Sequence, residues 1–133
     1  MKEDAGRKKQ MKKEIVTGDW LYMTPQEVDL RQIKEALDAK EKYDIEIWDE
    51  AGVLEVGMPD GNSFDIEEAK IHPKDEITAA FAANHHVKKV FLATFRPENY
   101  EEAEKVMQAI LAACGGFFCG DTDDFQPQIA GRE

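Results

Sequence analysis

Three aspartates within four positions form the densest group of potential metal ligands in this sequence. They are Asp121, Asp123 and Asp124, in the stretch GGFFCGDTDDF over residues 115–125. Carboxylates at this spacing can converge on a hard cation such as Ca²⁺ or Mg²⁺ if the backbone loops around it. The repeating aspartates and the final glutamate of an EF-hand loop are missing. The stretch therefore permits a divalent-cation site, but it favours an acidic surface turn after a short strand.

Histidine and cysteine offer weaker candidates for chemistry. His85 and His86 are adjacent, and neighbouring side chains diverge on both helices and strands, so we do not expect them to bind one metal ion together. A helix end, where imidazole can meet free carbonyl groups, explains the pair better, and His72 would join them only if the fold brings it close. The chain has a single serine, Ser63, and no motif around it indicates a nucleophile.

The two cysteines are spaced C-x4-C without a second pair, which is a weak zinc signal. Cys114 falls on the apolar stripe of an expected helix, so it is predicted to be an inert core residue. Cys119 ends an expected strand that enters the core, and its place beside Gly120 leaves open whether its thiol is accessible. Its aspartate neighbours should raise its pKa and suppress the thiolate, which disfavours nucleophilic catalysis.

Trp48 is the strongest candidate for recognition. Residues 43–48 alternate, so that Tyr43, Ile45 and Ile47 share one face of a strand, and Asp44, Glu46 and Trp48 share the other. An exposed tryptophan among carboxylates is typical of a protein-binding anchor. The alternative is that a helix covers Trp48, and Trp20 is expected in the core.

The net charge of the sequence restricts the classes of partner that the protein is expected to bind. The net charge is −11, but residues 1–14 carry six Lys/Arg against three acidic residues, which leaves −14 over residues 15–133. Such a body repels nucleic-acid phosphates and anionic membranes, and it can attract a basic protein. No apolar run resembles a secretory signal or a membrane span. We therefore expect a cytoplasmic protein with reduced thiols, no cofactor, no nucleic-acid partner and no membrane partner.

Hydrophobic periodicity predicts alternating strands and helices. Residues 1–13 are expected to be a disordered arm, and residues 14–133 a single domain. Thr24 with Glu27, and Asn99 with Glu102, resemble capping boxes, and Ile77 is expected to face inward. The expected elements are a strand within 14–23, a helix at 25–39, strands near 43–47 and 53–58, a strand or short helix near 64–70, a helix at 73–84, a strand at 87–95, a helix at 99–114, a strand at 117–119 and a loosely held tail from 125.

This order indicates an α+β fold. We expect a two-layer sandwich, with a mixed but largely antiparallel sheet of four to six strands and about three helices packed on it. No phosphate loop, nucleophile elbow or metal quartet is present. The favoured function is a non-catalytic, acidic interaction module that binds a basic partner protein, as inhibitor and immunity proteins do, through Asp44, Glu46, Trp48 and the aspartates at 121, 123 and 124. The alternative is a small metal-dependent enzyme or cation-binding domain that uses those three aspartates, and self-association through an exposed strand stays open.

Overall fold

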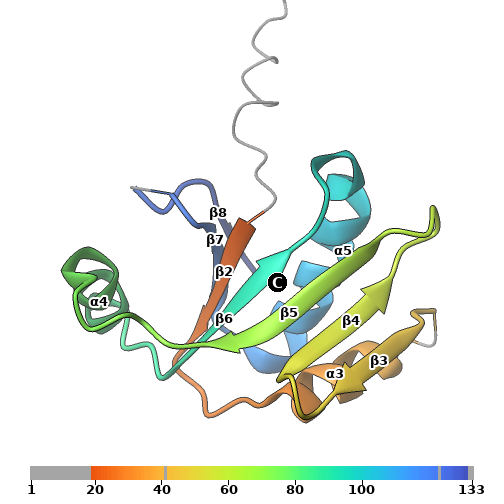
Figure 1. Ribbon diagram of the computed structural model, residues 1–133, viewed down its shortest axis with the longest axis horizontal. Helices are drawn as coiled ribbons and strands as arrows, with labels where there is room; N and C mark the ends of the chain where they lie inside the picture. The colour runs from red at the N-terminus through yellow and green to blue at the C-terminus, as the bar shows by residue number, and fades with distance from the viewer. Residues whose placement is uncertain (1–18, 41, 123, 132–133) are drawn as a thin grey trace, which may run out of the picture.

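A computed structural model describes residues 19–40, 42–122 and 124–131, which share one seven-stranded sheet (Figure 1). The predicted disordered arm at 1–13 lies outside these residues. The strands are β2 (Asp19–Thr24), β3 (Ile45–Trp48), β4 (Val53–Gly57), β5 (Ser63–Ala69), β6 (Lys89–Thr94), β7 (Phe117–Gly120) and β8 (Gln128–Ala130). The helices are α3 (Leu30–Asp38), α4 (Glu76–Asn84) and α5 (Tyr100–Cys114), with a 3-10 turn, η1 (Pro97–Asn99), before α5.

The α+β prediction is confirmed, with one strand more than the expected maximum. The strand order is β3-β4-β5-β6-β2-β7-β8, and every hydrogen-bonded pair in it is antiparallel. The described sheet therefore lacks the expected mixture of parallel and antiparallel strand pairs. β6 and β7 still run in the same direction, because both are antiparallel to β2, which lies between them. The segment near residues 64–70, which we expected to be either a strand or a short helix, is a strand, β5.

The main core lies between the sheet and the pair α3 and α5, which Figure 1 shows together behind the strands. Alternate residues of the strands point into it, because successive side chains of a strand face opposite sides. Tyr22 stacks on Phe118 with ring centroids 4.7 Å apart, and its hydroxyl donates to the Gly115 carbonyl at 2.5 Å. Burial raises the pKa of Tyr22, and the nearby Cys114 adds to this shift. Trp20 is fully buried, as predicted.

The first helix begins later than predicted. Thr24 is the last residue of β2 and pairs with Lys89, so it cannot cap a helix. Asp29 is the N-cap instead: its carboxylate accepts from the Gln32 backbone at 2.9 Å, and the Gln32 side chain accepts from the Asp29 backbone at 3.0 Å. This capping box is the same motif that we expected five residues earlier, and the strand takes precedence over it at Thr24.

The start of α5 also differs from the prediction. Asn99 precedes the helix but makes no side-chain cap, because its amide bonds to the turn between β4 and β5. Its Nδ2 donates to Asp60 Oδ2 at 2.8 Å, and its Oδ1 accepts from Asn62 at 3.0 Å. The helix ends as expected at two glycines with positive φ, and a Cβ on Gly116 would collide with the Met23 carbonyl. Close approach to β2 therefore requires glycine there.

The predicted loose tail contains a strand. β8 pairs with β7, so that Phe118 lies opposite Ile129, and Phe125 and Ile129 are both buried. Phe125 stacks on Phe81 of α4 at 4.1 Å between centroids. The tail is too short to show a clear periodicity, and its burial depends on the unpaired edge that β7 offers.

Helix α4 carries apolar residues on several sides, but Ala82 is its one buried residue. Phe81 and Ala82 approach the sheet, whereas Ile77 is 69% exposed, so the expectation that Ile77 faces inward is wrong. Figure 1 shows α4 beside one end of the sheet, away from α3 and α5. No helix within the described ranges is both long and apolar enough to cross a bilayer.

Candidate functional site: the open face of the sheet

The face of the sheet opposite α3 and α5 is only partly covered. Over β2, β6 and β7, α4 and the loop after β7 cover a small apolar cluster of Leu21, Met23, Cys119 and Phe125. Over β3, β4 and β5 no described element packs on this side, and we call this part the open face. Its strand residues alternate with the core residues. They are Glu46, Trp48, Val53, Glu55, Gly57, Ser63, Asp65, Glu67 and Ala69.

A row of carboxylates crosses the open face, and strand register creates it. Glu46 lies opposite Glu55, and Glu55 lies opposite Asp65. Side chains directly opposite each other on one face have Cβ atoms about 5 Å apart. The row continues past Thr94 of β6 to Asp19 of β2, at the end of the covered cluster. We call these carboxylates, with the Asp121 described next, the acidic row.

Asp121 completes the acidic row at its far end. Its backbone N–H donates to the Asp19 carbonyl at 3.1 Å, which continues the register of β7 on β2. Partial burial raises the pKa of Asp121, and the negative charges of Asp19 and Asp75 raise it further. The fold thus places the sequence-predicted residues Glu46 and Asp121 in one line, from the edge strand β3 to the end of β7.

Within the described residues, the central part of the acidic row has no neutralising partner. In the described part of the chain, Glu46, Glu55 and Asp65 form no ion pair within 4.0 Å, and the surface ion pairs found there involve other residues. By strand alternation, no Lys or Arg of β2 to β8 lies on this side of the sheet. Asp65 Oδ1 is buried and accepts no hydrogen bond. Like charges facing each other across strands destabilise the fold, so this arrangement has a free-energy cost.

Trp48 lies beside the acidic row, on the same face. It is 53% exposed at the end of edge strand β3, opposite Val53. The exposed aromatic that the sequence predicted is therefore present, and none of the described helices covers it. Asp44 also belongs to this face: its carbonyl accepts from Gly57 N at 2.8 Å, and a Cβ on Gly57 would lie 3.6 Å from the Asp44 Cβ.

The other predicted aspartates do not join this surface. Asp124 Oδ1 accepts from Thr122 Oγ1 and from Gln126 N, both at 3.1 Å, so this carboxylate organises its own turn. Asp123 lies outside the described residues. Within the ranges 19–40, 42–122 and 124–131, no group of three His, Cys, Asp or Glu side chains could hold a metal ion. The cation site stays a prediction that no described contact favours.

The thiols have no catalytic geometry. Cys119 is fully buried, which excludes the accessible position that the sequence left open and agrees with a last strand that enters the core. Burial and, to a smaller extent, the charge of Asp121 raise the pKa of Cys119 to about 12. Burial also raises the pKa of the half-buried Cys114. Both side chains are therefore thiols, not thiolates, at neutral pH.

Two histidines are bound to nearby backbone. His85 follows the last residue of α4, and its Nδ1 lies 2.8 Å from the Phe81 carbonyl, which fits the helix-end role expected from sequence. His72 Nδ1 accepts from Lys74 N at 3.0 Å, in a separate turn before α4. The His85 ring also packs against Phe81 and Phe117, so its described contacts are structural.

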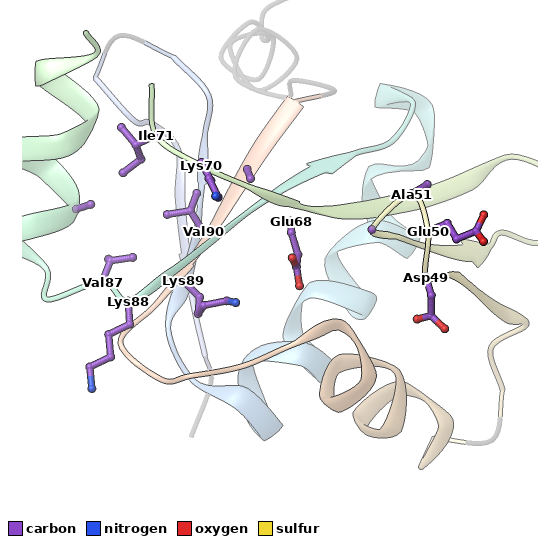
Figure 2. A pocket seen from close by; sticks show the side chains of 13 residues that line it. Asp49, Glu50, Ala51, Glu68, Lys70, Ile71, Val87, Lys88, Lys89 and Val90 are labelled. Atoms are coloured by element: carbon purple, nitrogen blue, oxygen red, sulfur yellow. The ribbon is translucent and has the colours of Figure 1, made fainter. Parts of the chain in front are cut away.

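A hollow of about 810 Å³ lies away from the acidic row, between α4, the β3–β4 turn and the start of β6 (Figure 2). Three acidic and three basic residues line it, so its charges balance. They are Asp49, Glu50, Glu68, Lys70, Lys88 and Lys89. In Figure 2 the Lys88 side chain points away from Lys89, and Asp49 is bound by Arg31 at 2.6 Å. The charged groups do not converge on one point as they would around a substrate.

Sequence reasoning missed Glu55, Asp65 and Asp19 as members of the site. The signal for Glu55 was available, because its alternation with Leu54 and Val56 was visible and a short turn separates β3 from β4. Asp65 and Asp19 required the strand order, which the sequence did not provide. Comparison with protein-family models, curated proteins and solved structures finds no match for this chain. Its function must therefore be argued from the surface itself.

Proposed function

We propose that this chain is a non-catalytic, cytoplasmic interaction module that binds a basic partner protein through the open face, in the manner of an inhibitor or immunity protein. The observation that carries this proposal is the acidic row with Trp48 beside it. The overall charge of −11 has the same sign as the row, so the whole molecule attracts a basic partner.

The dimensions of the surface suit a protein partner. Neighbouring strands are about 4.8 Å apart, so the five spacings from β3 to β7 extend the acidic row over roughly 24 Å. A stable interface buries about 800 Å² on each partner, which corresponds to a patch of similar width. A single small ligand would cover only a fraction of this line of carboxylates.

A basic partner would remove the cost that the acidic row imposes on the free protein. Glu46, Glu55 and Asp65 repel one another across the strands and have no described cation nearby. Lysine or arginine side chains placed between them convert this repulsion into charge-assisted contacts. Part of the binding free energy then comes from relief of an unfavourable interaction in the unbound state.

Trp48 supplies the apolar part of the contact. Tryptophan is enriched among the few interface residues that dominate binding energy, and such residues are surrounded by others that exclude water. Val53 lies opposite Trp48 and is half-buried, which extends the apolar patch along the edge of the acidic row. The carboxylates would control orientation and association rate, while Trp48 would control dissociation.

The test is a differential capture experiment with three forms of the full chain. Wild type, the double variant Glu46→Gln/Glu55→Gln and the control Glu35→Gln, on the exposed side of α3, are immobilised and exposed to extract of the source cell. We expect a basic protein that wild type and the control retain, that the double variant loses and that added salt releases. Retention of the same proteins by all three forms, or no basic protein at all, would contradict the proposal.

A further inference from the structure

The acidic row reaches the point where the described chain begins. Asp19 is the first described residue and the first residue of β2, and it belongs to the row by its register with Thr94. The eighteen residues before it contain two basic clusters, Arg7-Lys8-Lys9 and Lys12-Lys13. A basic segment of the sequence therefore precedes Asp19, one member of the acidic row, by only five residues.

We propose that the basic segment 1–13 occupies the acidic row of its own chain and competes with the partner for it. The competition rests on the proposed function, but the intramolecular contact does not. Charge complementarity supports it: residues 1–14 carry six Lys/Arg against three acidic residues, whereas the strand positions of the open face carry only acidic charges. Opposite charges at such surfaces attract over about 10 Å at moderate salt.

The length of the chain permits this contact. An extended segment spans about 3.3 Å per residue, so residues 14–18 cover roughly 16 Å from Asp19. The four strand spacings from β2 to β3 amount to roughly 19 Å. The cluster Lys12-Lys13 can therefore lie over Asp65 and Glu55, while Arg7-Lys8-Lys9 reaches Glu46 and Trp48 with chain to spare.

Because segment 1–13 is covalently joined to the domain, weak contacts are sufficient for it to occupy the acidic row. A segment joined to its site by a short linker has an effective concentration in the millimolar range. Individual exposed ion pairs are weak, so several of them at this concentration give partial occupancy. A partner with better contacts, including Trp48, can displace the segment, and its apparent affinity is reduced by the fraction of occupied sites.

The contact itself can be tested without any partner. NMR spectra of the full chain are compared with those of the variant Lys8→Gln/Lys9→Gln/Lys12→Gln/Lys13→Gln at low salt. We expect the Trp48 indole N–H and the Glu46 and Glu55 amides to shift, and these differences to vanish at high salt. The buried Trp20 indole serves as an internal control. A second control, Lys34→Gln/Lys105→Gln, removes lysines from α3 and α5 on the other side of the sheet.

Two outcomes would overturn the intramolecular contact. The first is identical Trp48 and glutamate signals in wild type and the four-lysine variant at low salt. The second is a shift that appears only as protein concentration rises, because it would place the segment on a second copy of the chain.

Competition is measured separately, once a partner is available. The four-lysine variant should bind it about 5-fold more tightly than wild type, the lower end of typical coupling between sites. Equal or weaker binding by the variant would exclude competition. If instead no partner is ever found, the NMR result still decides the intramolecular contact, so the two proposals fail independently.

Discussion

The face of the sheet opposite α3 and α5 has two different halves, one apolar and covered, the other acidic and exposed. Over β2, β6 and β7, the outward residues are apolar and α4 and Phe125 cover them. Over β3, β4 and β5, the charged outward residues are all carboxylates, and Trp48 is exposed among them. The first half contributes to folding by burying apolar area. The second half opposes folding through charge repulsion, so its composition does not serve stability, and we propose that it serves binding.

The two halves should differ most in how far a substitution lowers the free energy of unfolding. Phe125 is 6% exposed and stacks on Phe81, so Phe125→Ala should lower the free energy of unfolding by about 3 kcal/mol. Trp48→Ala, on the open face, should lower it by less than about 1 kcal/mol. Urea unfolding followed by circular dichroism measures both changes, and equal losses would show that the open face is part of the core.

For partner affinity, in contrast to stability, the large effect should come from the open face. Trp48→Ala should weaken binding of the captured partner by about 2 kcal/mol or more, roughly 30-fold, because an exposed anchor loses its contacts only in the complex. Ile77→Ala is the matched control, since Ile77 is the other large exposed apolar residue in the described chain, and it lies on α4. Calorimetric titration compares the two variants. An Ile77→Ala loss as large as that of Trp48→Ala would move the interface to α4.

Relief of charge repulsion should be visible in the free protein. Glu55 faces Glu46 on one side and Asp65 on the other, so in the four-lysine variant, where segment 1–13 no longer offsets these charges, Glu55→Thr should raise the free energy of unfolding by about 0.2–1 kcal/mol. Threonine also suits a strand. Glu35→Gln should leave stability within about 0.5 kcal/mol of wild type. A destabilised Glu55→Thr protein would mean that the acidic row is compensated in the unbound state.

The smallest effect concerns the far end of the row and its pH dependence. Burial, Asp19 and Asp75 raise the folded-state pKa of Asp121 above its ordinary value of 3.8. The protonated form is therefore favoured in the folded state, and its stabilising contribution is complete below pH 3.8 and lost as the pH rises through the raised pKa. Asp121→Asn, which mimics the protonated form, should gain stability relative to wild type at pH 7 compared with pH 3. Unfolding curves at both pH values check this, and an unchanged difference would place Asp121 in an ordinary solvated environment.

The sequence predicted those parts of the site that depend on a single strand. Alternation in residues 43–48 was sufficient to place Glu46 and Trp48 on one exposed face, and no neighbouring strand was needed. The α+β class followed in the same way from the order of periodic segments. Among features defined by local chemistry, the glycines that end α5 were predicted correctly, whereas the two helix caps were not.

Features that depend on tertiary contacts could not be predicted. Thr24 has the chemistry of a helix cap, but pairing with Lys89 keeps it in a strand. β8 exists because β7 offers an edge and the core accepts Ile129. Cys119 is buried because Phe125 and α4 return over it. The acidic row itself needed the order β3-β4-β5-β6-β2-β7, which no local pattern encodes.

The association rate of the captured partner as a function of salt tests the central claim most directly. If the acidic row steers a basic partner, stopped-flow association with wild type should slow by on the order of 10-fold as the Debye length falls from about 10 Å to about 3 Å. Glu46→Gln/Glu55→Gln should associate more slowly at low salt and depend less on salt, and Glu35→Gln should match wild type. An association rate that is insensitive to salt, or equal in wild type and the double variant, would contradict the account.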